Sequence, residues 1–267
     1  YYMYVGNSGW LLTGTPESTK IKSSTSTTYK SIPGFSGILS FGSSYVLNPL
    51  YSSNGLVGYW SFDEGSGSTA ADSSGNGNTG TLIGSPSWQT ASSCKVNGCI
   101  NFVSTGKYMD AGQGSSLTFP TGFSVSYWIK VPSTYSTWAA QVSKENYNSN
   151  VGWFIFSGTI SDIGYYGGTG TGWSNFGYGG GLPVNTWTHV VVTNSAGTTL
   201  IYLNGVYKSS TAYIYTDAAV NLLIGARHQN TGTSYTDSIQ GASMDEVRIY
   251  NRALSAGEVS AIYNATK

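Results

Sequence analysis

Two stretches decide the fold of this 267-residue chain: residues 58–81, GYWSFDEGSGSTAADSSGNGNTGT, and residues 244–263, MDEVRIYNRALSAGEVSAIY. Each begins with a short apolar run that is typical of a β-strand. A loop rich in Gly, Asn and Asp follows the first run, and a helix start follows the second. We interpret them as the first and last strands of one all-β domain, lying next to each other.

Further strand patterns recur along the chain from Leu56 onward. They are residues 123–131, 187–193, 200–208, 221–225 and 246–250. In the first of them, FSVSYWIKV, every second residue is apolar, which predicts a strand with one face in the core. The dipeptide Asn204-Gly205 favours a type I′ turn and therefore a hairpin.

Only one helix is well signalled, and it lies at the end of the chain. Ser255 and Glu258 have the spacing of a capping box, and Leu254 and Val259 that of a hydrophobic staple, which predicts a helix over residues 256–264. Roughly a dozen short strands and one terminal helix predict an all-β fold, a two-sheet antiparallel sandwich of the jelly-roll type.

The N-terminal part differs in composition, being rich in Ser, Thr and Tyr. Residues 1–14 have the pattern of a β-hairpin, residues 20–30 suit a polar linker, and residues 38–46 are expected to add a strand. We predict that residues 1–55 form a β extension and linker, and that residues 56–267 form the jelly-roll domain.

Charge is sparse and balanced. Lys plus Arg and Asp plus Glu both number 12, and charged residues make up 9% of the chain, against about a quarter in a typical domain. Nucleic acid is therefore not an expected partner. No apolar run approaches the roughly 20 residues that span a bilayer. The neutral, hydroxyl-rich composition resembles that of exported proteins, so we expect an extracellular or cell-surface location and a targeting signal upstream of Tyr1.

The two cysteines, Cys94 and Cys99, lie on either side of the turn dipeptide Asn97-Gly98. A local disulfide is favoured over two buried thiols, and it implies an oxidising compartment. A zinc site is disfavoured because neither histidine has the spacing of a metal ligand.

The loop at residues 72–78, DSSGNGN, places oxygen-bearing side chains at alternate positions. This resembles the first half of the calcium loop of an EF-hand and makes Asp72, Asn76 and Asn78 candidate ligands of a structural Ca²⁺. The same residues also suit an ordinary turn in which Asp72 accepts backbone N–H groups.

A second carboxylate for this ion would come from the last strand. Alternation places Asp245 on the apolar face of that strand with Val247, where a carboxylate is costly unless it is paired or binds a metal. Asp63 is a further candidate ligand. The alternative is that Asp245 only accepts backbone N–H bonds.

The stretch of residues 152–181 alternates aromatic residues with glycine. Exposed rings on a β scaffold can stack on sugar rings. They can equally fill the core or contact another subunit. The candidate ligand-binding residues are Trp173, Tyr166, Tyr178, Trp138 and His228.

Catalysis is not expected. A glycosidase needs two carboxylates facing each other across a cleft. Alternation predicts that the neighbours in Asp63-Glu64, and those in Asp245-Glu246, point to opposite faces. His189 lies inside a strand pattern, where a structural role is more common than that of a base.

Several motifs occur in an order that resembles the laminin-G-like (concanavalin A-like) jelly-roll family over residues 56–264. They are YWSFDEGSG, DSSGNGNTGTL, FSVSYWIK, WTHVVVT, LIYLNGV, LLIGAR and MDEVRIYNRALSAGEVSAIY. The resemblance implies a mostly non-catalytic module that binds sugars or proteins outside cells, often with Ca²⁺ between the first and last motifs. Separately, the Tyr-rich N-terminal hairpin resembles the end of a type IV pilin-like or pseudopilin head. Its alternative is an extra hairpin on the edge of the jelly roll.

These features together predict a non-catalytic extracellular module, stabilised by Ca²⁺, that binds carbohydrate or a surface protein and mediates adhesion. One alternative is a structural subunit of a surface filament or pilus-like appendage, which would self-associate. The other is the binding appendage of a larger secreted enzyme. Fold alone does not choose among them.

Overall fold

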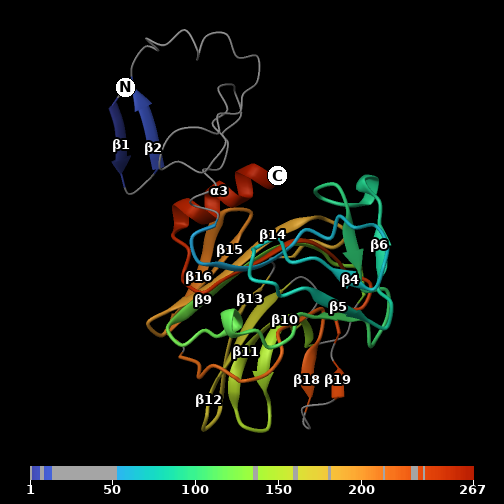
Figure 1. Ribbon diagram of the computed structural model, residues 1–267. Coiled ribbons are helices and arrows are strands. Elements are labelled where there is room, and N and C mark those ends of the chain that lie inside the picture. The colour runs from blue at the N-terminus through green and yellow to red at the C-terminus, as the bar shows by residue number, and fades with distance from the viewer. Residues whose placement is uncertain are drawn as a thin grey trace.

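The computed structural model describes residues 2–6, 9–13, 53–134, 138–158, 162–179, 182–212, 214–229, 234–236 and 238–267. Most of these residues form two antiparallel eight-stranded sheets stacked face to face, which confirms the predicted jelly-roll sandwich (Figure 1). Among the described residues, no helix combines the length and the hydropathy that a membrane span needs.

Sheet I contains, in order across the sheet, β13 (Trp173–Tyr178), β12 (Ile163–Thr169), β11 (Val151–Ser157), β10 (Ala139–Asn146), β17 (Leu223–Ile224), β8 (Tyr108–Asp110), β5 (Gly80–Ile83) and β4 (Thr69–Ala70). Sheet II contains β16 (Val206–Ala212), β15 (Thr198–Leu203), β14 (Thr188–Ser195), β9 (Gly122–Lys130), β20 (Ser243–Tyr250), β7 (Cys99–Asn101) and β6 (Ser87–Gln89), with β3 (Leu56–Trp60) paired to β20.

The remaining elements are short. They are the hairpin β1 (Tyr2–Gly6) and β2 (Gly9–Thr13), the hairpin β18 (Arg227–Gln229) and β19 (Ser234–Thr236), the 3₁₀ turns η1 (Ala91–Ser93) and η2 (Ser115–Leu117), and helix α3 (Ala256–Thr266). The pairing of β1 with β2 confirms the hairpin predicted at the N-terminus. The linker predicted at residues 20–30 and the strand predicted at residues 38–46 lie outside the described residues.

The first and last strands of the sandwich pair with each other, as the sequence predicts. Trp60 of β3 lies opposite Val247 of β20, and Gly58 lies opposite Ile249. A Cβ atom on Gly58 would lie 2.5 Å from the indole of Trp60, so only glycine leaves room for this ring. Trp60 is fully buried and donates its Nε1–H to Asn78 O at 3.0 Å, which ties the first strand to the loop that follows it.

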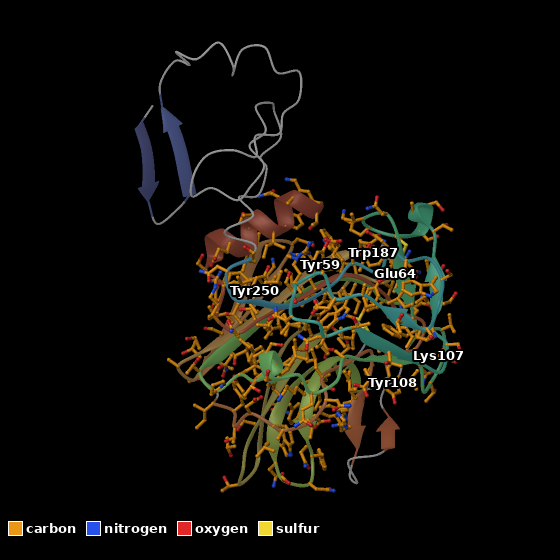
Figure 2. All side chains as sticks on the ribbon, viewed as in Figure 1. Tyr59, Glu64, Lys107, Tyr108, Trp187 and Tyr250 are labelled. Atoms are coloured by element: carbon orange, nitrogen blue, oxygen red, sulfur yellow. A yellow bond between two sulfur atoms is a disulfide. The ribbon has the colours of Figure 1, made fainter. Side chains whose placement is uncertain are left out.

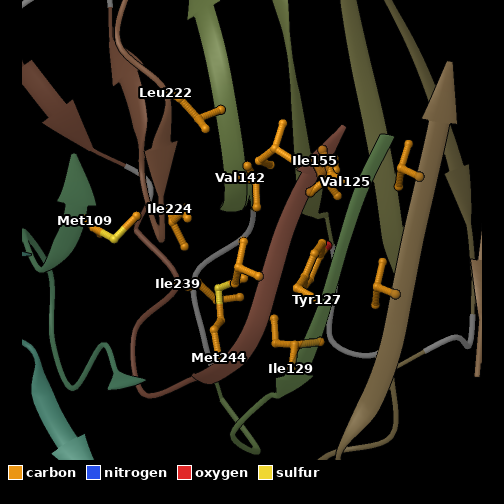
Figure 3. Close-up of a cluster of buried hydrophobic side chains, with 14 of the residues drawn as sticks. Met109, Val125, Tyr127, Ile129, Val142, Ile155, Leu222, Ile224, Ile239 and Met244 are labelled. Carbon is orange, nitrogen blue, oxygen red and sulfur yellow. The ribbon is translucent and has the colours of Figure 1, made fainter. Parts of the chain in front are cut away.

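The core lies between the two sheets, and strand β9 shows how it is built. Its predicted inward residues, such as Val125, Tyr127 and Ile129, are all buried there (Figure 3). They meet residues of sheet I, including Val142 and Ile155. Tyr127 donates its hydroxyl hydrogen to the side chain of Gln141 across the core. The alternation of β9 is therefore the pattern of a strand with one face in the core.

Helix α3 covers part of the outer face of sheet II (Figure 1). Val259 and Ile262 of the helix pack with Tyr250, which is labelled in Figure 2 beneath the helix. The capping box is confirmed: Ser255 Oγ accepts the N–H of Glu258, and Glu258 Oε2 accepts the N–H of Ser255 at 2.8 Å. The helix continues two residues past the predicted end at residue 264.

Candidate functional site

Cys94 and Cys99 form the predicted disulfide, with their Cα atoms 5.4 Å apart. Residues 94–99, called the disulfide loop below, turn at Asn97, whose φ is +48°. This left-handed conformation is one that Asn tolerates better than most residues, which explains its place in the turn.

The carboxylate of Asp72 is surrounded by hydrogen-bond donors. It accepts the N–H groups of Tyr59 at 2.9 Å, Ser74 at 2.8 Å and Asn78 at 2.8 Å, together with the hydroxyl of Ser74 at 2.9 Å. Both oxygens are used. This is the turn arrangement that the sequence left open as the alternative to a calcium ligand.

The two asparagines of this loop, in contrast, act as hydrogen-bond donors. Asn78 is 6% exposed and donates through Nδ2 to Val57 O at 2.7 Å and to Ser116 Oγ at 2.9 Å. Asn76 is exposed and donates to Leu56 O at 3.2 Å. These contacts fasten the loop to β3, because Leu56 and Val57 are the first two residues of that strand.

A β-bulge in β20 turns two neighbouring acidic side chains to one face. The pairing of β20 with β9 shifts register between Asp245 and Arg248, and Glu246 has a φ of +56°. Val247 stays in the core, whereas Glu246 accepts the hydroxyl hydrogen of Tyr59 on the outer face of sheet II at 3.0 Å. Two predictions are therefore wrong: Asp245 does not share the apolar face of Val247, and it does not point away from Glu246. An extra residue in the strand breaks the alternation on which both predictions relied.

Asp245 binds the disulfide loop. Its Oδ2 accepts the N–H groups of Lys95 at 3.0 Å and Val96 at 2.9 Å. The residue is fully buried, and its Oδ1 has no hydrogen-bond partner. Burial raises the pKa of Asp245 to about 7; the N–H of Val96 opposes this shift, and the charge of Glu246 adds to it.

The predicted calcium ligands do not form one shell. Asp72 and Asp245 share no hydrogen-bond partner, and Asp63 accepts the N–H of Gly98 through Oδ1 at 2.8 Å. Among the described residues, no group of three or more His, Cys, Asp or Glu side chains is placed to hold a metal. The carboxylates fit the role of acceptors for backbone N–H groups better than that of ion ligands. Calcium stays a prediction from the sequence.

A charged pair, Glu246 and Arg248, lies beside Asp245 on the outer face of sheet II. Arg248 forms an ion pair with Glu246 and lies over the ring of Tyr59 at 4.2 Å. Nearby, His189 Nε2 lies 3.0 Å from Ser126 Oγ. Burial, assisted by the charge of Arg248, lowers the pKa of His189 to about 3, so the imidazole is neutral at pH 7. These contacts are those of a structural network.

The aromatic residues of the glycine-rich stretch gather on the outer face of sheet I. Trp153 and Ile155 of β11 belong to the core, so Phe154 and Phe156 point outward. Phe154 lies opposite Tyr166 of β12. We define the aromatic face as the six outward rings that contact one another in this region: Trp138, Tyr147, Phe154, Phe156, Tyr166 and Trp173.

The rings of the aromatic face form a continuous row. Phe154 and Tyr166 stack with centroids 4.9 Å apart and an interplanar angle of 2°. Trp138 stacks on Phe156 at 5.0 Å, and Phe156 lies 5.3 Å from Tyr166. At the other end, Trp173 lies 6.0 Å from Phe154 and stacks with Tyr147 at 5.7 Å.

Exposure changes along this row. Phe154 and Phe156 are 1% and 6% exposed and form a buried base, whereas Trp138 and Tyr147 are each 41% exposed. Tyr166 and Trp173 are half-buried. The most exposed rings, Trp138 and Tyr147, thus present a hydrophobic surface to solvent on a base that holds them in place.

A glycine allows the rings to lie flat. Gly164 of β12 is paired with Phe156, and a Cβ atom there would lie 2.4 Å from the Phe156 ring. Any other residue at position 164 would push this ring, and Trp138 with it, off the sheet. The alternation of glycine with aromatics in the sequence therefore has a packing reason.

Two charged residues adjoin the aromatic face. The guanidinium of Arg227 lies 4.8 Å from the ring of Phe154 and 5.6 Å from that of Tyr147. Glu145 of β10 is fully buried on the same side, opposite Gly152. The face therefore carries one positive and one negative side chain and has no strong charge of its own.

Two predicted ligand-binding residues lie elsewhere. Tyr178 packs against the core between the sheets, because it is an even number of residues from the inward Phe176. His228 is 5% exposed, and its Nε2 lies 3.2 Å from Asn221 O. The other three, Trp173, Tyr166 and Trp138, lie together on the aromatic face.

Sequence reasoning missed the contribution of Phe154, Phe156 and Arg227 to this face. The run Trp153–Phe156 is apolar at every position, which left no sign that two of its rings point outward. The signal that could have found Phe156 is Gly164 on the neighbouring strand, which leaves space for its ring on the outer face. Nothing local marks Arg227, which reaches the face from β18.

The comparisons with known proteins agree with this fold. The family model described as concanavalin A-like lectin/glucanases superfamily matches residues 103–260. No curated protein sequence matches the chain.

Three solved structures illustrate the likeness. The binding domain of Paraclostridial Mosquitocidal Protein 1 has a TM-score of 0.64 at 17% identity, over 80% of this chain and 52% of that one. The binding domain of botulinum neurotoxin serotype D has a TM-score of 0.62 at 15% identity, over 79% and 52%. Domain 4 of AbnA, an extracellular arabinanase from Geobacillus stearothermophilus solved in complex with arabinotriose, has a TM-score of 0.59 at 21% identity, over 79% and 98%.

The chain spans about half the length of the two toxin domains and nearly all of the arabinanase domain. At these identities the likeness shows the fold, a β-sandwich shared with binding domains. The family match extends over more than half of the chain. The chain belongs to the concanavalin A-like lectin/glucanases superfamily.

Proposed function

We propose that this chain is a non-catalytic binding module whose aromatic face binds carbohydrate. The observation that carries the proposal is the continuous row of six outward rings on sheet I. A sugar presents an apolar C–H face that stacks on such rings, and its hydroxyls are hydrogen-bonded by neighbouring polar groups.

The polar groups beside the rings suit this ligand. Asn175 is exposed next to Tyr166 and donates to its hydroxyl oxygen at 2.9 Å, so its amide oxygen remains at the surface as an acceptor. The indole Nε1–H of Trp173 lies 3.4 Å from Tyr147 O, a long contact that a ligand hydroxyl could replace. The balanced charge of Glu145 and Arg227 favours a neutral glycan over an acidic one.

The extended shape of the row favours a chain of sugar units over a single one. The row runs from Trp138, before β10, to Tyr147, after β10, with two rings at each end and two in the middle. An oligosaccharide lying along it would contact several rings at once, and each contact adds to the affinity. The arabinotriose bound by the arabinanase domain is a ligand of this kind for that protein.

A catalytic role is not supported by the carboxylates of the sandwich. Asp245 and Glu246 share a face, but Asp245 accepts backbone N–H groups through Oδ2, and Glu246 binds Tyr59 and Arg248. The disulfide supports an oxidising, extracellular setting, in which the module would act in recognition or adhesion. The filament and secreted-enzyme alternatives stay predictions from the sequence, as does the pilin-like resemblance of the N-terminal hairpin.

The proposal is tested by binding of the purified chain to a panel of immobilised plant and bacterial glycans, with Trp173→Ala and Tyr147→Ala as variants. Loss of one stacked ring is expected to weaken binding about tenfold, since such contacts are worth about 1 kcal/mol or more. The matched control is Tyr207→Ala, which removes a ring that is 51% exposed on β16 of sheet II. Unchanged glycan binding by Trp173→Ala and Tyr147→Ala would overturn the proposal.

A further inference from the structure

A cleft of about 380 Å³ opens beside β6, away from the aromatic face. Three segments form its walls: the loop after β3, strand β6 with the turn that follows it, and the disulfide loop. The side chains that matter here are Asp63, Trp88, Gln89, Thr90 and Asn97. Glu64, labelled in Figure 2, marks the first of these segments. The cleft shares no residue with the aromatic face.

The three walls are fastened to one another. Asp63 Oδ1 accepts the N–H of Gly98 at 2.8 Å, which joins the first wall to the disulfide loop. Gln89 of β6 is paired with Cys99 of β7, so the disulfide holds the second wall as well. Trp88 donates its Nε1–H to Gly67 O at 3.0 Å, which joins β6 to the first wall. The cleft is therefore pre-formed, and a ligand would not have to order it.

Two residues with left-handed backbone conformations lie at the cleft. Phe62, which precedes Asp63, has a φ of +61°, and Asn97, which precedes Gly98, has a φ of +48°. Phe62 is fully buried and bulky, so its left-handed conformation is strained. Backbone strain of this kind is typical of functional sites, where it fixes the direction of a side chain. Here the conformation of Phe62 directs the carboxylate of the next residue, Asp63, to the cleft.

The lining indicates the class of ligand. Trp88 is half-buried and supported by Phe62, whose ring centroid lies 6.4 Å away, so it offers one fixed apolar platform. Around it stand the side chains of Gln89, Thr90 and Asn97, which both donate and accept hydrogen bonds, and the acceptor Asp63. No Lys, Arg or His lines the cleft, so an anion would meet only the repulsion of Asp63.

We propose that this cleft is a second binding site, which takes one ring of a neutral sugar. The ring would stack on Trp88 and exchange hydrogen bonds with Asp63, Gln89 and Asn97. The volume is near the lower end of the range for small-molecule sites, which suits one ring or two. With the aromatic face, the domain would hold two separate sites, able to link two glycan chains or two parts of one chain.

The test uses fluorine NMR of the whole chain labelled with 5-fluorotryptophan, which gives one signal for each of the eight Trp residues. The Trp88 signal is assigned by its loss in Trp88→Phe. The probes are glucose, galactose, mannose, arabinose and N-acetylglucosamine, and separately choline chloride as an organic cation. Concentrations reach about 50 mM, because a single-ring contact gives a Kd near the millimolar range.

We expect at least one of the sugars to shift the Trp88 signal saturably. The Trp138 and Trp173 signals should depend on sugar concentration in a different way, because they report on the aromatic face. Asp63→Asn and Gln89→Ala should each weaken the Trp88 response about fivefold, as expected for one lost hydrogen bond. Gln113→Ala, which changes an exposed glutamine outside the cleft, should leave it unchanged.

Three results would overturn the inference. They are no saturable Trp88 shift with any sugar, a shift with choline alone, and a sugar response that Asp63→Asn and Gln89→Ala do not weaken. Sugar-dependent shifts of Trp138 and Trp173 without one of Trp88 would reject this site and leave the proposed function standing. The remaining tryptophan signals report in the same spectra whether each variant is folded.

Discussion

Asp245 and Glu246 are consecutive residues of β20, yet both carboxylates lie on the outer face of sheet II. Asp245 binds the N–H groups of the disulfide loop, and Glu246 binds Tyr59 of the first strand. The bulge thus lets one short stretch of the last strand hold two distant parts of the chain. Its cost is a non-glycine residue at a φ of +56° and a carboxylate buried with one free oxygen.

The first prediction concerns the pH dependence that Asp245 imposes. Its pKa is about 7 in the folded protein, against about 4 in an unfolded chain. Between these values the folded state holds a proton that the unfolded state lacks, so this residue lowers stability as the pH rises from about 4 to 7. A shift of three pKa units corresponds to a loss of stability of at most about 4 kcal/mol over this pH range.

Asp245→Asn removes this titration. We expect the variant to gain stability relative to the native chain as the pH rises. Its free energy of unfolding minus that of the native chain should be larger at pH 8 than at pH 5, as measured by urea denaturation. His189 has a lowered pKa and acts in the opposite direction between about 3 and 6.5, but it is present in both proteins and cancels in the difference. Gln113→Ala, a control that changes an exposed side chain without a titrating group, should show no such change. Equal differences at the two pH values would contradict the raised pKa.

The second prediction concerns the disulfide. Closing a loop as short as the one between Cys94 and Cys99 stabilises a protein by about 2 kcal/mol in the chain-entropy model. Reduction should cost more than this here, because the loop also supplies the N–H groups that bind Asp245 and Asp63. Urea denaturation with and without dithiothreitol measures the loss. A double Cys→Ser variant as stable as the oxidised chain would show that the loop is held by other contacts.

The third prediction concerns a buried ion pair at the end of the core. Lys144 is 2% exposed, and its Nζ lies 3.0 Å from Asp217 Oδ1. Burial lowers the pKa of Lys144, and the charge of Asp217 opposes this shift. Asp217→Asn leaves the ammonium group without its counter-charge and should destabilise the chain by about 3 kcal/mol.

The matched control for this pair is the double variant Lys144→Met with Asp217→Asn. Replacing a buried ion pair by uncharged groups of similar size is often close to neutral, so the double variant should recover most of the stability lost in Asp217→Asn. Thermal or urea denaturation of the native chain and the two variants measures this directly. If the double variant is no more stable than Asp217→Asn, the loss comes from the amide side chain introduced at position 217 and not from the unpaired charge of Lys144.

The fourth prediction addresses calcium. An ion bound only by the folded state must raise the melting temperature. Because the oxygens of Asp72 are occupied by N–H and hydroxyl donors, we expect the same melting temperature in EDTA and in excess CaCl₂. A rise with CaCl₂ that is lost in both Asp72→Ala and Asp245→Ala would instead establish the ion predicted from the sequence between the first and last strands.

Local patterns predicted much of the fold because the features involved depend on near neighbours. The alternation of β9, the capping box of Ser255 and Glu258, and the disulfide between Cys94 and Cys99 are all present as predicted. The pairing of the first and last strands was also predicted, from the order of motifs along the chain.

The site was predicted less completely. Tyr166 and Trp173 were identified because aromatic residues among glycines are unusual, and both lie on one face with Trp138, which was a separate candidate. Tyr178 and His228 were chosen on composition alone: Tyr178 packs against the core on the inner face of its strand, and His228 is buried. In a strand, a change of one position moves a side chain from one face of the sheet to the other, so composition cannot assign it.

Local sequence patterns were enough to predict the sandwich, its first and last strands, its helix and its disulfide, because strand period, capping and turn preferences act over a few residues. Three features became known from the folded chain alone: the direction of Asp245 and Glu246, the choice of the aromatic rings that face outward, and the cleft between β6 and the disulfide loop. Each of these depends on a bulge, a cross-strand register or a contact between segments far apart in the chain. Such features are set by how whole strands fit together, and no local pattern encodes them.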